Sequence, residues 1–160
     1  MSKIRATAVT WQTKPMPEQR KELLLDGRYT TAEFVQMSLG YMPQDQQDKW
    51  FIYLEGEWLS FHRSWTGTCI FQLQLVAIEA GYHAPKAIVN RDPAQYRNSD
   101  DVYDVSLMAY LIDHLLLGRF APLPVPRTIS QADRERHQQH VMGDEAEGGL
   151  TLKVLGNGNK

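Results

Sequence analysis

The sequence has only one cysteine, Cys69, among its 160 residues. A single thiol cannot close an internal disulfide, which excludes the disulfide-stapled scaffolds of small secreted proteins. Because Cys69 lies in the apolar run CIF, we expect a buried, unreactive side chain in a reducing compartment.

Long hydrophobic runs are also absent. The longest apolar stretch, around residues 111–117, is interrupted by Asp113 and His114 and is shorter than the roughly 20 apolar residues that span a bilayer. The opening residues MSKIRAT do not have the apolar segment of a secretory signal. These absences predict a cytoplasmic protein that does not associate with membranes.

Neither sign of charge is in large excess, because 17 basic and 19 acidic side chains give a formal net charge of -2. This balance argues against general nucleic-acid binding. The sequence contains no Gly-rich phosphate loop and no HExxH, CxxC or GxSxG motif. It therefore indicates no particular cofactor, and we assign no residue to a metal site.

The apolar residues that are present, 42% of the chain, suffice for one globular domain. We expect a single α+β domain over residues 1–120. Residues 121–160 are expected to form a C-terminal extension, with a helix at about 130–142, a short strand at about 150–155 and a flexible end. The predicted fold is an antiparallel β-meander of four or more strands, with a long helix packed on one face and peripheral helices.

Capping signals indicate where the early helices begin. Pro17 suits the first turn of a short helix over residues 17–25, although a strand over residues 22–25 is the alternative. Thr30 and Glu33 have the spacing of a capping box, which predicts a second helix directly after them.

Residues 49–90 alternate in the manner of an antiparallel meander. The runs KWFIYL and WLSFHR flank Glu55-Gly56, the expected hairpin loop, and TCIFQLQLVAI and YHAPKAIVN are the next strands. Pro85 near the start of the last of these strands predicts that this strand lies at the edge of the sheet. The apolar segment from about residue 100 to 117 is the predicted long helix.

The first hairpin has two unequal faces. One face is predicted to join the core; it holds Trp50, Ile52, Leu54, Leu59 and Phe61. The other face is mixed; it holds Phe51, Tyr53, Trp58, Ser60 and His62. Because the long helix covers only one face, we expect the aromatic face to be covered by N-terminal helices, by a second copy in a homodimer or by a partner protein.

Polar residues follow the second and fourth strands of this meander. These two strands run in the same direction, so their C-terminal ends and the start of the first strand lie at one edge of the sheet. The residues expected there as ligand-binding groups are Lys49, Arg63, Ser64, Trp65, Thr66, Asn90 and Arg91. Guanidinium, ammonium and hydroxyl groups suit a phosphate or carboxylate, and an indole ring offers a stacking surface.

A purely structural interpretation of the same residues is also open. Arg63 could pair with Asp92, Trp65 could pack under the turn, and Ser64 and Thr66 could satisfy local backbone groups. In a catalytic interpretation, His62 would be a general base and Asp92 would orient it.

The central half of the chain, DKWFIYLEGEWLSFHRSWTGTCIF followed by VNRDPAQY, resembles a bacterial family of uncharacterised domains. The strands of that family carry the same WFIY, HRSWTG and NRD runs. The resemblance implies a bacterial protein in which the HRSWTG and NRD turns form a shared site, and it implies no particular activity.

Two functions follow from these patterns. The first is a non-catalytic module that binds an anionic, nucleotide-like ligand or a partner protein through the HRSWTG and NRD turns. The alternative is a small hydrolase or transferase acting on a phosphorylated or nucleotide substrate, with His62 as its base.

Overall fold

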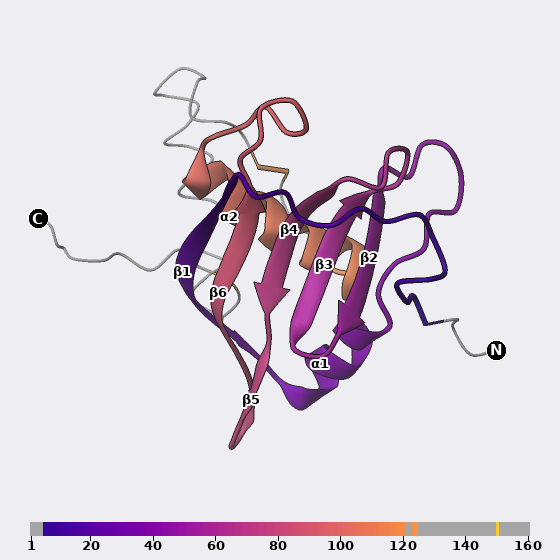
Figure 1. Ribbon diagram of the computed structural model, residues 1–160. Helices are drawn as coiled ribbons and strands as arrows, with labels where there is room; N and C mark the ends of the chain where they lie inside the picture. The colour runs from indigo at the N-terminus through magenta and orange to yellow at the C-terminus, as the bar shows by residue number, and fades with distance from the viewer. Residues whose placement is uncertain (1–4, 121–122, 125–149, 151–160) are drawn as a thin grey trace, which may run out of the picture.

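The computed structural model describes residues 5–120, 123, 124 and 150 (Figure 1). Its elements are β1 (Arg20–Tyr29), α1 (Thr31–Ser38), β2 (Trp50–Glu55), β3 (Trp58–Arg63), β4 (Cys69–Gln74), β5 (Val76–Ile78), β6 (Gly81–Asn90), α2 (Asp101–Leu111) and a π-helical turn, η1 (Ile112–Leu116). The helix predicted at 130–142 and all but the first residue of the strand predicted at 150–155 lie outside the described residues.

The strands form one antiparallel sheet in the order β1-β6-β4-β3-β2, and β5 pairs with β6. An α+β fold with an antiparallel sheet was predicted, and it is confirmed. The β2–β3–β4–β6 part is the predicted meander, and β1 adds to it beside β6, which is distant in sequence (Figure 1). The next strand along the chain, β2, lies at the opposite edge of the sheet.

The helix predicted over residues 17–25 is wrong, because this segment begins the long strand β1. The strand alternative over residues 22–25 is the correct one. Burial alternates from Leu23 through Leu25 to Tyr29, which is the period of a strand with one buried face. Pairing with β6 satisfies the backbone of this segment, so a tertiary contact overrides the local signal of Pro17.

The capping box of α1 is present as predicted. Thr30 Oγ1 accepts a hydrogen bond from the Glu33 backbone N–H at 3.0 Å, and Glu33 Oε1 accepts one from the Thr30 N–H at 2.8 Å. The two bonds satisfy N–H groups at the start of the helix that would otherwise have no partner.

The β2–β3 hairpin has a two-residue loop, but the loop is Gly56-Glu57, one residue later than predicted. Gly56 has a φ of 62°, which fits the first position of a type II′ loop, a position that favours glycine. The true register pairs Glu55 with Trp58 and Tyr53 with Ser60. Partners differ by two residues from the expected register, so the assignment of side chains to the two faces is unchanged.

Strand β6 lies inside the sheet, between β1 and β4, so the edge position predicted from Pro85 is wrong. The pairing between β1 and β6 shifts between Leu24 and Gly27, opposite Lys86 and Ala84. Pro85 therefore lies opposite an irregularity in the ladder, where its missing N–H does not interrupt regular pairing.

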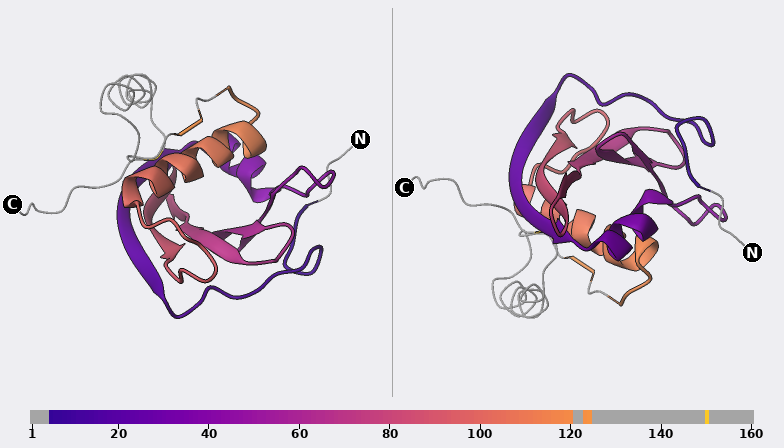
Figure 2. Two further views of the ribbon diagram at one scale, coloured as in Figure 1. Left: turned by 90° about the horizontal axis from the view of Figure 1, so that it is seen from above. Right: turned by 90° about the horizontal axis from the view of Figure 1, so that it is seen from below.

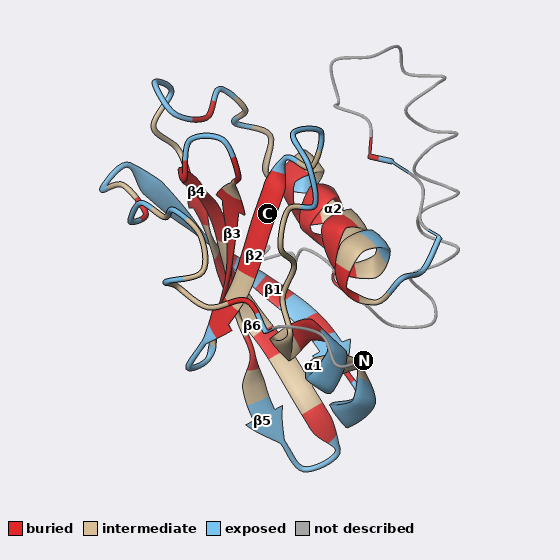
Figure 3. Ribbon diagram, turned by 90° about the vertical axis from the view of Figure 1, so that its right-hand side faces the viewer, coloured by how far each residue is buried: buried red, intermediate tan, exposed pale blue. Residues whose placement is uncertain are grey.

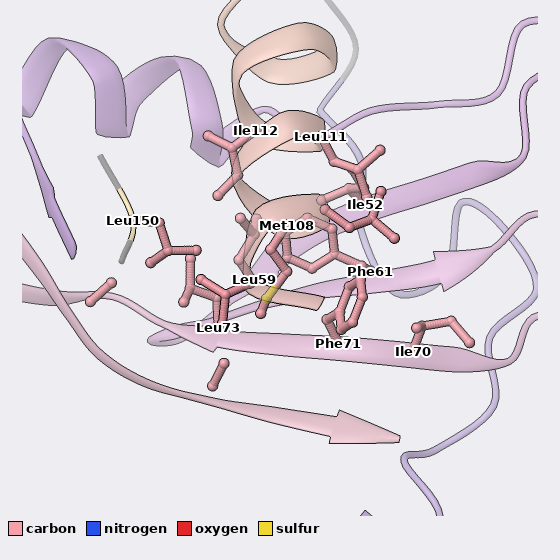
Figure 4. Close-up of a cluster of buried hydrophobic side chains, with 14 of the residues drawn as sticks. Ile52, Leu59, Phe61, Ile70, Phe71, Leu73, Met108, Leu111, Ile112 and Leu150 are labelled. Atoms are coloured by element: carbon pink, nitrogen blue, oxygen red, sulfur yellow. The ribbon is translucent and has the colours of Figure 1, made fainter. Parts of the chain in front are cut away.

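The predicted long helix is α2 continued by η1, and it packs on one face of the sheet (Figures 2 and 3). Met108, Leu111 and Ile112 point onto the sheet (Figure 4). The large side chains that they meet, all buried, are Ile52, Leu59, Phe61, Phe71 and Leu73. Within the described ranges the other helix is α1, and no helix there is long and apolar enough to cross a membrane.

The opposite face of the sheet is crossed by residues 5–19, which we call the N-terminal strap (Figure 2). Trp11 stacks on Phe51 with ring centroids 6.3 Å apart, and Phe51 is fully buried. The strap is extended and irregular, so this face is covered by a segment without helix; of the two expected N-terminal helices, the first is replaced by β1 and the second forms as α1. Because the protein's own chain covers Phe51, this residue offers no surface to a second copy or a partner, while Tyr53 and Trp58 are half-buried.

Candidate functional site

The HRSWTG turn and the NRD loop meet at one end of the sheet. Strands β3 and β6 run in the same direction because each is antiparallel to β4, which lies between them. The two loops that follow them line an open pocket of about 450 Å³, here called the corner pocket. Its lining residues are Lys14, Lys49, Arg63, Trp65, Thr66, Thr68, Ala94 and Gln95.

Three cationic side chains reach the corner pocket from separate elements. Lys14 comes from the N-terminal strap, Lys49 precedes β2 and Arg63 ends β3. Within the described part of the chain, the pocket lining contains no acidic residue, and none of these three side chains forms an ion pair. The pocket therefore has an uncompensated positive charge.

Arg63 is held in place without a carboxylate. Its guanidinium lies over the Trp50 ring, 4.6 Å from the centroid, and its backbone N–H donates to the Thr68 carbonyl at 2.8 Å. The ion pair with Asp92 considered from the sequence is not among the ion pairs of the described residues. Asp92 Oδ1 instead accepts a hydrogen bond from the Ala94 N–H at 2.9 Å. A cation over an aromatic ring keeps its charge and its N–H donors available.

Trp65 projects from the turn and is 68% exposed. Its Nε1–H donates to the Gln46 carbonyl at 2.9 Å, which fixes the plane of the indole. Trp65 is therefore not packed under the turn, and one wall of the corner pocket is an exposed aromatic surface.

Ser64 and Asn90, which were predicted as ligand-binding residues, do not line the corner pocket. Ser64 is buried, and its Oγ donates to the Asp48 carbonyl at 2.7 Å. Asn90 is fully buried, and its Nδ2 donates to the Cys69 carbonyl and to Gln95 Oε1, each at 2.9 Å. The second of these bonds engages the amide oxygen of Gln95 and leaves its Nε2 donors for the pocket.

Arg91 does not belong to the pocket, although the sequence predicted it as a ligand-binding residue. Its Nη2 forms ion pairs with Asp101 Oδ1 at 2.6 Å and Asp104 Oδ2 at 2.7 Å. Asp104 Oδ1 also accepts from the Tyr96 hydroxyl at 2.5 Å and from Asn98 Nδ2 at 2.8 Å. This network joins the end of β6 to the first turn of α2.

The electrostatics of this network follow from burial and pairing. Burial tends to raise the pKa of Asp101, but hydrogen bonds and charges from Lys21 and Arg91 lower it below its ordinary value. For Asp104, which is completely buried, desolvation dominates and raises the pKa despite Tyr96 and Arg91. Arg91 is thus a structural residue whose positive charge is balanced by the carboxyl groups of Asp101 and Asp104.

His62 is buried on the strap side of the sheet, and its ring is stacked on Tyr53 with centroids 5.6 Å apart. Its Nδ1 lies 2.9 Å from the Gly67 carbonyl, which requires the proton on that nitrogen. Desolvation lowers the pKa of His62, with the Gly67 hydrogen bond opposing it. The His62 ring is thus hydrogen-bonded to Gly67, at the other end of the HRSWTG turn. No hydrogen bond among the described residues links His62 to Asp92.

Cys69, opposite His62 in the β3–β4 ladder, is fully buried as expected. Burial raises the pKa of its thiol to about 12, so the thiol is protonated at neutral pH. Among the residues that the structure describes, no group of His, Cys, Asp and Glu side chains could hold a metal ion.

Sequence reasoning missed four lining residues, Lys14, Thr68, Ala94 and Gln95. Thr68 directly follows the HRSWTG run and Gln95 lies in the quoted run VNRDPAQY, so extending each turn by a few residues would have found both. Lys14 lies in a segment without periodicity, and nothing local indicates that it returns to this end of the sheet.

The fold and pocket define an α+β domain with a cationic hollow at one end of an antiparallel sheet. Comparisons of the chain with protein-family models, with curated proteins and with solved structures find no match in any of the three. The resemblance to a bacterial family therefore stays a prediction from the quoted runs.

Proposed function

We propose that this protein is a non-catalytic binding module whose corner pocket holds a phosphate-bearing, nucleotide-like anion. The observation that carries the proposal is the convergence of Lys14, Lys49 and Arg63 on a pocket without an acidic lining residue among those described. Like charges gathered in this way repel one another, and a bound anion would relieve that repulsion.

The remaining lining residues suit the rest of such a ligand. Thr66, Thr68 and Gln95 supply hydroxyl and amide groups for phosphate or sugar oxygens. The exposed ring of Trp65 offers a surface on which a base can stack. The same cations would attract an acidic protein surface, but a hollow of about 450 Å³ has the size of a small-molecule site and favours the nucleotide-like ligand.

A hydrolase or transferase would need a reactive group at the ligand. His62, the base of the catalytic interpretation, is buried and is not among the residues that line the corner pocket. The placement of His62 therefore gives the enzymatic alternative no support.

Calorimetric titration with two probes, sodium pyrophosphate and adenosine 5′-monophosphate, tests the proposal. The wild type should bind both, and Lys49→Gln should weaken both by about tenfold, the loss expected for one charge-assisted hydrogen bond. Lys86→Gln is the matched control, because it removes the same charge from the pair with Glu22, 3.1 Å away. Its binding should equal that of the wild type.

Trp65→Ala separates the two parts of the ligand. It should weaken binding of the nucleotide by about fivefold or more, the lower range for base stacking on an aromatic side chain, and leave pyrophosphate binding unchanged. A wild type that binds neither probe contradicts the proposed function. Equal binding by the wild type and Lys49→Gln contradicts it as well.

A further inference from the structure

We infer that Trp11 and Gln12 of the N-terminal strap are positioning residues for the anion in the corner pocket, and that they act through Lys14. The inference rests on the proposed function and extends it to a segment that the sequence did not connect with the site. Lys14 is the pocket cation most distant in sequence from the HRSWTG turn, and it reaches the pocket only because the strap is docked there.

The strap is attached to the same turn that forms the pocket. Trp11 Nε1 donates to the Ser64 carbonyl at 2.7 Å. Gln12 Nε2 donates to the Ser64 carbonyl at 3.0 Å and to the Trp65 carbonyl at 2.8 Å. The Lys14 backbone N–H then donates to the Gly67 carbonyl at 2.8 Å.

Gly67 shows how close this contact is. Its φ is 80°, a backbone conformation that favours glycine, and a Cβ built at this position would lie 3.2 Å from the Gln12 carbonyl oxygen. The turn therefore has both the conformation and the space that the docked strap requires.

The side chain of Lys14 has a different environment from its backbone. The backbone is fixed by the Gly67 carbonyl, whereas the ammonium group has no ion-pair partner in the described part of the chain. A cation whose backbone is held in advance loses less conformational freedom when an anion binds. Undocking the strap would remove this cation from the pocket, and affinity would fall although Trp11 and Gln12 do not line the pocket.

Coupling of this kind is reciprocal. If docking of the strap favours anion binding, then a bound anion must favour docking by the same factor. The Lys14 amide reports docking, because its hydrogen exchange requires its bond to the Gly67 carbonyl to open.

A double-mutant cycle with pyrophosphate tests the inference. Gln12→Ala and, separately, Trp11→Phe, which keeps a ring against Phe51 but removes the indole donor, should each weaken binding by about threefold or more in the wild-type background. In the Lys14→Gln background the same changes should have less than about a twofold effect, since the cation that they position is gone.

Val9→Ala is the control on the strap, because this side chain is 90% exposed. It should leave pyrophosphate binding unchanged.

Added salt should weaken pyrophosphate binding less steeply in Gln12→Ala than in the wild type, because one fewer charge then acts on the anion. Saturating pyrophosphate should also slow exchange of the Lys14 backbone amide in the wild type, and exchange of the amide at the same position of the Lys14→Gln protein should be unaffected.

The possible failures are distinguishable. Weaker binding in Lys49→Gln but unchanged binding in Lys14→Gln overturns this inference and leaves the proposed function standing. Equal effects of Gln12→Ala in the two backgrounds overturn the positioning role. A wild type that binds no pyrophosphate overturns the proposed function and this inference together.

Discussion

Arg63 is the last residue of β3, and Arg91 directly follows β6, a strand that runs in the same direction. The two arginines therefore lie at the same end of the sheet, but their surroundings are opposite. Arg91 is paired with two carboxylates, one of them completely buried, whereas Arg63 lies on the Trp50 ring and forms no ion pair among the described residues. The same residue type therefore stabilises the fold at one corner and leaves positive charge available at the other. The presence or absence of carboxylate partners, more than the arginine itself, distinguishes the structural corner from the cationic corner.

Removing the Arg91 side chain should have the largest effect. Arg91→Ala leaves Asp104 buried without its cation, so the free energy of unfolding should fall by about 3–5 kcal/mol. Urea unfolding followed by circular dichroism measures the change. Arg97→Ala, an exposed arginine of the same loop, should stay within about 0.5 kcal/mol of the wild type. A loss below about 1 kcal/mol in Arg91→Ala would remove the contrast between the two corners.

Gly67→Ala should have the next largest effect, at the cationic corner. A Cβ in this left-handed conformation close to Gln12 should lower the free energy of unfolding by about 1–3 kcal/mol. Gly56→Ala is the matched control, because Gly56 also has a positive φ but a Cβ there would meet nothing within 4 Å. If the two variants lose equal stability, the close approach of the strap contributes nothing, and only backbone conformation matters.

Arg63→Gln should change binding more than folding. Its stability should fall by only about 0.5–1 kcal/mol, the contribution of a cation–π contact. Its affinity for pyrophosphate should fall by about tenfold or more, which titration calorimetry measures. A stability loss as large as that of Arg91→Ala, with unchanged binding, would show that Arg63 is a structural residue as well.

The smallest expected effect concerns pH and His62. Its pKa is lowered in the folded protein from the ordinary 6.5, so below about pH 6.5 the unfolded chain binds a proton that the folded protein does not. Stability should therefore fall as the pH decreases from 6.5 toward the folded pKa. His62→Asn, whose amide can still donate to the Gly67 carbonyl, should show a flatter dependence of melting temperature on pH in this range. Identical pH profiles would mean that His62 does not titrate with folding.

The sequence predicted where the candidate site lies, but not which of its charged side chains are paired with carboxylates. Successive antiparallel strands reverse direction, so the sequence could place the HRSWTG turn and the NRD loop at one end of the sheet. Residues of the HRSWTG turn line the corner pocket, as do Ala94 and Gln95, which follow NRD in the same loop. The pairing of Arg91 with Asp101, ten residues later, depends on how α2 docks against β6. No local sequence pattern indicates whether Arg63 or Arg91 will pair with a carboxylate.

By itself, the sequence determined what short-range physics controls. It determined the alternation of the strands, the two faces of the first hairpin, the capping box at Thr30 and the apolar helix on the sheet. Tertiary structure alone decided that residues 20–29 are a strand, because β6 supplies their hydrogen bonds, and that the strap brings Lys14 to the corner pocket. Periodicity and capping depend on residues a few positions apart, whereas strand pairing across the sheet and the gathering of charges depend on segments that meet only after folding.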